Sequence, residues 1–268
     1  MTNVHSNAVV DKSAELGKGV VIGPNVVINS GVSIGDGTVI DANVFIGKDV
    51  KIGKGNHIFP NASIGAQPQL LAMGPDDPIG KLEIGDNNIL REQVTIHPSM
   101  HADSLTKIGN KNFLMIGVHI GHDCVLEDQI VMSNYAQISG HCKIETGVWL
   151  SGMVLLHQFI TIGRWAYAAG LAGINHDVPP FLIVSGHYPP EVRGVNKRGF
   201  SRAGLNETEQ MAIYDAYRKL YRTDGPLLEK AKAMLNNGSL DVNVRDMAEA
   251  IVRGSEHRYG RYLEQFRD

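Results

Sequence analysis

The 268-residue sequence predicts an all-β solenoid of hexapeptide repeats, followed by a small C-terminal α-helical domain. The first observation is a run of ten apolar residues, spaced six apart, from Val10 to Ile64. The second is that six of these ten are followed directly by glycine and three by Asp or Asn, which tolerate the backbone angles of a tight bend. Three short strands joined by such bends make one triangular coil of 18 residues, which distinguishes a solenoid from ordinary alternating strands.

Residues of one kind recur 18 apart, as expected where the corners of successive coils stack. Asn25, Asn43 and Asn61 follow this spacing, and so do the only two cysteines, Cys124 and Cys142. Strand spacing would place the two cysteines about 4.8 Å apart. Two thiols do not make a disulfide framework, and they fit a reducing compartment. We therefore expect two stacked, buried cysteine side chains without a bond between them.

The repeat fails at two places along the solenoid. The register breaks after Ile64, so residues 66–81 are expected to leave the coils as a loop. Residues 98–107 keep the length of the repeat but lose its pattern, which predicts a second loop. The repeat then continues from Ile108 to Ile174 and ends at the two prolines of DVPPF, because proline cannot donate to the ladder between coils.

Helical patterns replace the repeat in the last third of the chain. The segment LNETEQMAIYDAYRKLYR carries a helix signature, with Asn206 as N-cap and Glu209 three residues later as the partner in a capping box. Pro226 is expected to begin another helix, and DMAEAIVRG and RYGRYLEQF indicate one or two more. The expected division is a solenoid domain over residues 1–185 and a C-terminal helical domain over residues 186–268.

Composition and charge exclude several classes of function. The net charge of −3 gives no general reason to expect a nucleic-acid partner. No positively charged leader precedes an apolar run near Met1, and no stretch approaches the roughly 18 apolar residues that span a bilayer. The expectation is a cytoplasmic protein without integral membrane association.

Histidines gather in the middle of the solenoid, at His97, His119, His122, His141 and His157. His122 and His141 are one coil plus one residue apart, which predicts neighbouring side chains in a shared cleft. The motif HIGHDC allows a metal site of several imidazoles or a general base oriented by a carboxylate. A His-x-x-His step across a bend does not direct both imidazoles to one side, so we expect no metal. With an ordinary pKa of ~6.5, His122 is the candidate general base.

At HIGHDC, SGHCKI, LLHQF and RGVNKRGFSRAG, the chain resembles the bacterial UDP-N-acetylglucosamine O-acyltransferases, which catalyse the first step of lipid A biosynthesis. The resemblance covers nearly the whole chain. It implies a left-handed parallel β-helix and a homotrimer with active sites in clefts between neighbouring chains. It also implies transfer of a 3-hydroxyacyl group from acyl-carrier protein to the 3-hydroxyl of UDP-N-acetylglucosamine. No cofactor is implied beyond the phosphopantetheine of the carrier protein, which carries the acyl donor.

The resemblance also assigns roles to individual residues. His122 corresponds to the catalytic base, Asp123 to the residue that orients it, and Gly140 to the glycine whose N–H binds the oxyanion. Gly170 falls at the acyl-length ruler, where glycine leaves the groove open for a longer chain. The residues that match substrate-binding positions are Gln69, His97, His119, His141, His157, Gln158, Asn196 and Arg202.

One departure from the family leaves the acceptor open. Typical members carry an acid and a lysine in the first loop, whereas here Gln69 is followed by residues 70–73, which read LLAM. One hypothesis is the same reaction with an altered substrate loop. A second is a paralogous acyltransferase acting on another sugar nucleotide, including N-acylation of a 3-amino sugar. A third is a non-catalytic β-helix that binds carrier protein or nucleotide.

Overall fold

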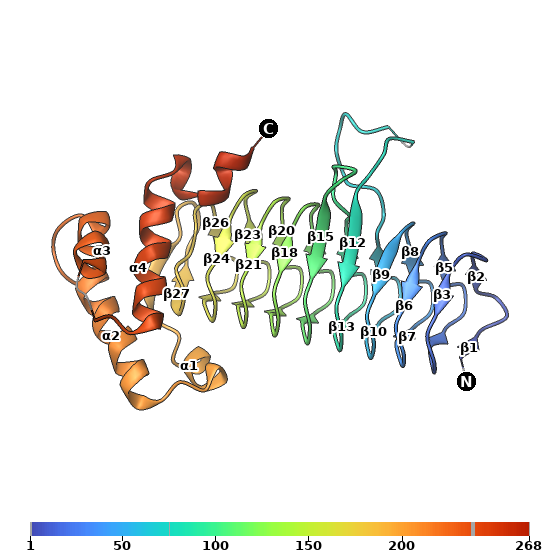
Figure 1. Cartoon of the computed structure of the whole chain (residues 1–268), viewed down its shortest axis with the longest axis horizontal. Coiled ribbons are helices and arrows are strands. Elements are labelled where there is room, and N and C mark those ends of the chain that lie inside the picture. Colours follow the sequence, from blue (N-terminus) through green and yellow to red (C-terminus); the bar gives the residue numbers. More distant parts are fainter. Residues whose placement is uncertain (1, 75, 237–238, 268) are drawn as a thin grey trace.

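The computed structural model describes residues 2–74, 76–236 and 239–267. Pro75 of the first predicted loop, and the outer ends of the two predicted domains at Met1 and Asp268, lie outside these residues. Short parallel strands form three sheets that wind around one axis as left-handed coils (Figure 1). The fold class predicted from the six-residue repeat is therefore confirmed.

The three sheets, named A, B and C here, are the three faces of a triangular prism. Sheet A contains β1 (Asn3–Val4), β4 (Val21–Ile22), β7 (Val39–Ile40), β10 (His57–Ile58), β13 (Ile89–Leu90), β16 (Phe113–Leu114), β19 (Val131–Met132), β22 (Trp149–Leu150), β25 (Tyr167–Ala168), β27 (Leu182–Ser185) and β28 (Glu191–Val195). Sheet B contains β2 (Val9–Val10), β5 (Val27–Ile28), β8 (Phe45–Ile46), β11 (Ser63–Ile64), β14 (Thr95–Ile96), β17 (His119–Ile120), β20 (Gln137–Ile138), β23 (Leu155–Leu156) and β26 (Gly173–Ile174). Sheet C contains β3 (Glu15–Leu16), β6 (Ser33–Ile34), β9 (Val50–Ile52), β12 (Lys81–Ile84), β15 (Leu105–Ile108), β18 (Val125–Leu126), β21 (Lys143–Ile144) and β24 (Thr161–Ile162).

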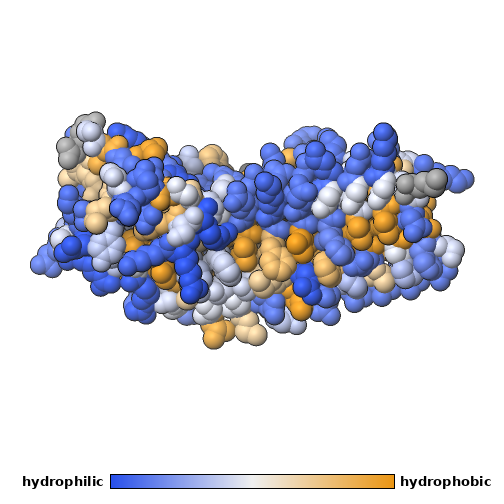
Figure 2. Space-filling model, turned by 90° about the horizontal axis from the view of Figure 1, so that it is seen from below, coloured by the Kyte–Doolittle hydropathy of each residue, from blue (hydrophilic) through white to orange (hydrophobic). Residues whose placement is uncertain are grey.

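The core is a column of aliphatic side chains inside the prism. The last residue of a typical strand points inward and is completely buried, as at Ile58. The residue before it faces outward, and its character differs between faces. Sheet C carries charged pairs such as Lys51 and Glu83, 3.1 Å apart, whereas sheet A exposes apolar side chains such as Val21 and Ile89. Figure 2 shows apolar surface along the solenoid beside hydrophilic surface on the side seen from below.

The corners are built as the 18-residue spacing predicts. Asn25, Asn43 and Asn61 have left-handed backbone angles, with φ of 57°, 60° and 63°. Their side chains form a ladder, with Asn25 donating to Asn43 over 3.1 Å and Asn43 to Asn61 over 3.3 Å. Cys124 and Cys142 are both buried and unbonded, as expected.

The chain leaves the coils twice, between β11 and β12 and between β14 and β15. A column of buried polar side chains continues across both excursions. The Asn56 side-chain oxygen accepts from the N–H of Asn88 over 2.9 Å, and the Asn88 oxygen accepts from the N–H of Asn112 over 2.9 Å. These partners are 32 and 24 residues apart instead of 18, so the column keeps the coils in register where the sequence spacing changes.

The six-residue spacing ends at Pro179 and Pro180, but the sheet does not. β27 pairs with β25 in parallel and with β28 in antiparallel orientation, so sheet A continues to Val195. The helices that follow are α1 (Lys197–Ala203), α2 (Glu207–Tyr221), α3 (Leu227–Leu235) and α4 (Val242–Ser255), with the 3₁₀ turns η1 (Arg258–Gly260) and η2 (Tyr262–Phe266).

The helix signals at Asn206, Pro226 and DMAEAIVRG are confirmed, whereas RYGRYLEQF forms the 3₁₀ turns η1 and η2 and not an α-helix. The capping box of Asn206 and Glu209 is formed at the start of α2, and Pro226 is the N-cap of α3. The helices pack over the end of the solenoid through a second apolar cluster that includes Phe181 and Met247. Within the described ranges, no helix is long and apolar enough to cross a membrane.

Candidate active site

Most of the predicted site residues lie along one edge of the prism, where the coils bend from sheet B to sheet C. We call this edge the histidine corner. It is formed by residues 121–123, 139–141, 157–159 and 175–177. Both loop excursions leave from the same edge, which is uppermost in Figure 1, and the C-terminal turns lie over its other end. The corner therefore lies between two irregular segments.

His122 and Asp123 form a buried dyad at this corner. The Nδ1 of His122 lies 2.8 Å from Oδ2 of Asp123, and both side chains are less than one-tenth exposed. The Asp123 carboxylate also accepts from the Ser99 hydroxyl and from the N–H of Met100. Burial alone would raise the pKa of Asp123, but hydrogen bonds from His122, Ser99 and Met100 outweigh it and lower that pKa to about 2. An ionised Asp123 keeps the proton of His122 on Nδ1 and leaves Nε2 able to accept one.

Gly140 lies directly against the imidazole of His122. A Cβ at Gly140 would be 2.6 Å from Cε1 and 2.7 Å from Nε2 of His122, so only glycine fits without moving the ring. Among the described residues, the Gly140 N–H has no hydrogen-bond acceptor. A backbone donor is thus free beside the nitrogen that would act as base.

His97 and His119 form the sheet B side of the site. The Nδ1 of His97 donates to the carbonyl of Ala66 over 2.9 Å, and its buried Nε2 is left without a partner among the described residues. The Nδ1 of His119 is 2.8 Å from the Thr95 hydroxyl. Burial lowers the pKa of His97, and burial with the neighbouring His97 and His122 lowers the pKa of His119 to about 4. Both rings are therefore neutral at pH 7.

His141 lies beside His122, as predicted, with ring centroids 5.0 Å apart. Its other face stacks on Phe159, with ring centroids 4.5 Å apart and planes 2° from parallel. On the next coil, His157 is exposed and Gln158 half-buried. The structure therefore brings His122, His141 and His157 into one row along the corner.

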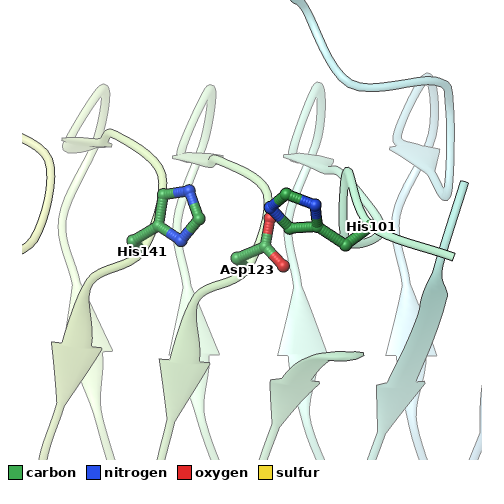
Figure 3. A group of neighbouring side chains, drawn as sticks. All are labelled: His101, Asp123 and His141. Atoms are coloured by element: carbon green, nitrogen blue, oxygen red, sulfur yellow. The ribbon is translucent and has the colours of Figure 1, made fainter. Parts of the chain in front are cut away.

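His101, Asp123 and His141 come nearest to a metal site among the described residues. Figure 3 shows His101 on the second loop excursion, facing Asp123 and His141 on adjacent coils, with ligand atoms within 4.8 Å of one another. The Asp123 carboxylate of this group already accepts hydrogen bonds from three donors. That no metal is bound stays a prediction.

Four predicted residues lie away from the histidine corner. Gln69 is exposed on the first loop excursion, and Gly170 is exposed at the corner between sheets A and B. Asn196 is the buried N-cap of α1, and its amide also donates to the Trp165 carbonyl over 2.8 Å. Arg202 donates to the carbonyls of two coils at the corner between sheets C and A. Their substrate-binding and ruler roles stay predictions.

Sequence reasoning missed two residues that the structure places at the corner. Ser99 lies 24 residues before Asp123, inside a stretch without repeat pattern. Arg261 contacts His157 from 104 residues further along the chain. Neither residue carries a periodic or motif signal, because each reaches the corner from an irregular segment.

Residues 177–260 match the family described as UDP-N-acetylglucosamine O-acyltransferase, domain 2, and residues 14–48 match the hexapeptide repeat of succinyl-transferase. The acyl-[acyl-carrier-protein]--UDP-N-acetylglucosamine O-acyltransferase of Gloeothece citriformis (strain PCC 7424) is 41% identical over 160 residues, which span 59% of this chain and 58% of that protein. The protein of the same name from Janthinobacterium sp. (strain Marseille) is 42% identical over 236 residues, 88% of both chains.

Solved structures give the same relationship. The crystal structure of Francisella novicida UDP-N-acetylglucosamine acyltransferase has a TM-score of 0.85 and 36% identity, and the match covers 92% of this chain and 90% of that chain. The Janthinobacterium protein shares its sequence with this chain, and the Francisella protein shares both sequence and fold, along nearly the whole chain. The chain belongs to the UDP-N-acetylglucosamine O-acyltransferase family.

Proposed function

We propose that this protein transfers a 3-hydroxyacyl group from acyl-carrier protein to the 3-hydroxyl of UDP-N-acetylglucosamine, the first step of lipid A biosynthesis. The observation that carries the proposal is the buried His122–Asp123 pair with Gly140 packed against the imidazole. The pair supplies a base oriented by a carboxylate, and the glycine supplies an N–H beside it. An acyl transfer needs both of these groups.

The proposed reaction begins when Nε2 of His122 takes the proton of the sugar hydroxyl. The resulting oxygen nucleophile attacks the thioester carbonyl, and the Gly140 N–H donates to the oxyanion that forms. The tetrahedral intermediate then collapses, the C–S bond breaks, and the proton on His122 passes to the leaving thiolate of phosphopantetheine. Asp123 stays ionised and stabilises the imidazolium between the two proton transfers. No cofactor beyond the phosphopantetheine arm enters this scheme.

Nucleotide-sugar binding is assigned to the row around the base. The unpartnered Nε2 of His97 suits a hydroxyl donor of the sugar, because Nδ1 of the same ring is already donating. His119, His141, His157 and Gln158 line the corner around it, and Gln69 lies on the loop excursion beside them.

The site is proposed to be completed in a homotrimer. Asn196 and Arg202 lie at another corner of the prism from His122, so residues of both groups meet only if the edges of two chains lie side by side. The exposed apolar side chains of sheet A, such as Ile89, support an interface between chains. We place the reaction in the cytoplasm because both cysteines are free thiols.

The deciding experiment incubates the full chain with 3-hydroxyacyl carrier protein and UDP-N-acetylglucosamine, and repeats the assay with the His122→Ala variant. Acylated sugar nucleotide is expected from the wild type, with a loss of about 10²–10⁴-fold in the variant. Absence of product from the wild type would refute the proposed function. Full turnover by His122→Ala would refute the base.

A second acceptor is favoured by one observation, the apolar stretch of residues 70–73 on the first loop excursion. Leu71 in this stretch is fully exposed, and the stretch lacks both the acid and the lysine that typical family members carry in this loop. We infer that a 3-amino analogue of the sugar nucleotide is the alternative substrate, since an amine also needs a base such as His122. Parallel assays decide between the two acceptors by their kcat/KM values.

A further inference from the structure

The C-terminal segment of residues 260–267 packs along the histidine corner. The carbonyl of Gly260 accepts from the N–H of Asp177 over 2.8 Å, and the Asp177 carboxylate accepts from the N–H of Tyr262 over 2.9 Å. The guanidinium of Arg267 lies 4.5 Å above the Phe159 ring, on which His141 also stacks. In Figure 1 this segment lies over the last coils, on the edge from which the loops also leave.

Arg261 reaches from this segment into the row of histidines. Its side chain is 6% exposed. One terminal nitrogen contacts Nδ1 of His157 and lies 3.2 Å from the carbonyl oxygen of Gln158. The carboxylate of Glu264, itself nearly buried, is 3.3 Å from the Arg261 Nε and also accepts two hydrogen bonds from Arg267. The Arg261 Nε has no hydrogen-bond partner among the described residues, so its terminal nitrogen contacts with His157 and Gln158 fix where the guanidinium points.

The contact with Arg261 determines which nitrogen of His157 carries the proton. A guanidinium can only donate, so Nδ1 of His157 must accept and the imidazole must carry its proton on Nε2. The same Nδ1 also lies 3.2 Å from the carbonyl oxygen of Gln158, which can only accept. In a variant without Arg261, this oxygen would be the remaining partner of Nδ1. That contact favours the opposite tautomer, with the proton on Nδ1 and Nε2 turned from a donor into an acceptor.

We propose that Arg261 is a positioning residue of the acyltransferase site, which holds His157 as the Nε2-protonated tautomer so that His157 presents an N–H donor to the nucleotide sugar. The part of this inference that concerns the substrate rests on the proposed function. The part that concerns the tautomer does not, because it depends only on contacts within the chain.

The tautomer is tested first, by ¹⁵N NMR of the full chain with labelled histidine, with the His157 signals identified by their loss in His157→Gln. The wild type is expected to show protonated Nε2 and unprotonated Nδ1 at neutral pH, and Arg261→Met to show the reverse or a mixture. Arg261→Lys keeps a group that only donates, so it is expected to restore the wild-type pattern. The matched control is Arg258→Met, an exposed arginine three residues before Arg261 that contacts Tyr259.

Kinetics then test the consequence for substrate. Loss of one hydrogen bond to the sugar nucleotide is expected to raise the KM for that substrate about 3- to 10-fold in Arg261→Met, with kcat and the KM for acyl-carrier protein nearly unchanged. If Arg261 acts through His157, adding Arg261→Met to His157→Ala has little further effect. Arg258→Met is expected to match the wild type.

Two results would overturn the proposal. One is a folded Arg261→Met variant in which His157 still carries its proton on Nε2. The other is an equal rise in KM when Arg261→Met is made in the His157→Ala background, because Arg261 would then act by another route. Failure of the wild type to acylate the sugar nucleotide would refute the proposed function instead, since the NMR result is independent of turnover.

Discussion

Gly140 packs against the His122 ring on the adjacent coil, and this contact leaves no room for a side chain at position 140. We predict that Gly140→Ala leaves the solenoid folded but lowers kcat/KM by roughly 10²-fold, because the new Cβ would come within 2.7 Å of the His122 ring and displace it. Steady-state assays with the carrier-protein donor measure the loss.

Gly152→Ala is the matched control for that prediction. A Cβ at Gly152 would meet only the Asn134 carbonyl oxygen at 3.6 Å, an ordinary contact. Its activity is expected to stay near that of the wild type. An equal loss of activity in both variants would show that the reduced backbone freedom of alanine, and not contact with His122, lowers kcat/KM.

Gly170 tests the predicted acyl-length ruler. A side chain fits at this position, since the nearest atom to a built Cβ is the Gly152 carbonyl oxygen at 3.5 Å. Gly170→Met is therefore expected to fold normally, to lose activity with long acyl donors, and to retain or gain activity with short ones. The measurement is kcat/KM for a series of acyl-carrier proteins of increasing chain length. A strong preference of the wild type for short chains would contradict the ruler.

At the scale of elements, the strands were predictable because each one needs only an inward aliphatic residue and a bend beside it. The same signal placed both loops, where the pattern fails. It did not predict that sheet A continues beyond Pro180, because β27 and β28 form a hairpin with its own register. Nor did it reveal the contact of Arg261 with the corner, since a segment in 3₁₀ turns has no periodic apolar pattern.

Asp177, which accepts a hydrogen bond from the C-terminal segment, makes the stability of the protein depend on pH. Burial raises the pKa of Asp177 to about 6, despite hydrogen bonds from the N–H groups of Tyr262 and Thr161. Because the folded pKa lies above the unfolded value of ~3.9, the stabilisation from the protonated form is complete below about pH 4 and is lost as the pH rises through about 6.

The predicted outcome concerns the difference in unfolding free energy between the wild type and the non-titrating Asp177→Asn variant. This difference should shift by about 2 kcal/mol against the wild type between pH 4 and pH 7. Urea unfolding of both proteins across this range measures it, and a ¹³C titration of the carboxyl gives the pKa directly. A difference that does not vary with pH would contradict the raised pKa.

At the scale of the whole molecule, the candidate site is divided between two edges of the prism. If a trimer joins the His122 edge of one chain to the Arg202 edge of the next, two inactive variants should complement each other. Equal mixing of His122→Ala and Arg202→Ala chains, unfolded and refolded together, is expected to restore about a quarter of the wild-type activity, because one site in four receives both intact residues.

Light scattering and separately refolded variants are the controls for this mixing experiment. Each variant alone should remain inactive and should have the mass of a trimer. A monomer at assay concentration, or no recovery on mixing when both variants assemble, would refute the site between chains. This division also explains why the sequence grouped the histidines but could not place Asn196 and Arg202 beside them.

The buried column of Asn56, Asn88 and Asn112 has a consequence for how such a protein can change. A slip of one residue would turn every inward side chain outward, yet the column holds each coil in place by its own amide contacts and not by the length of chain between coils. A change of length in the first loop excursion therefore leaves the register of the coils that carry His122 and Gly140 unchanged. The second excursion is more constrained, because it also supplies the Ser99 hydroxyl and the Met100 N–H to Asp123.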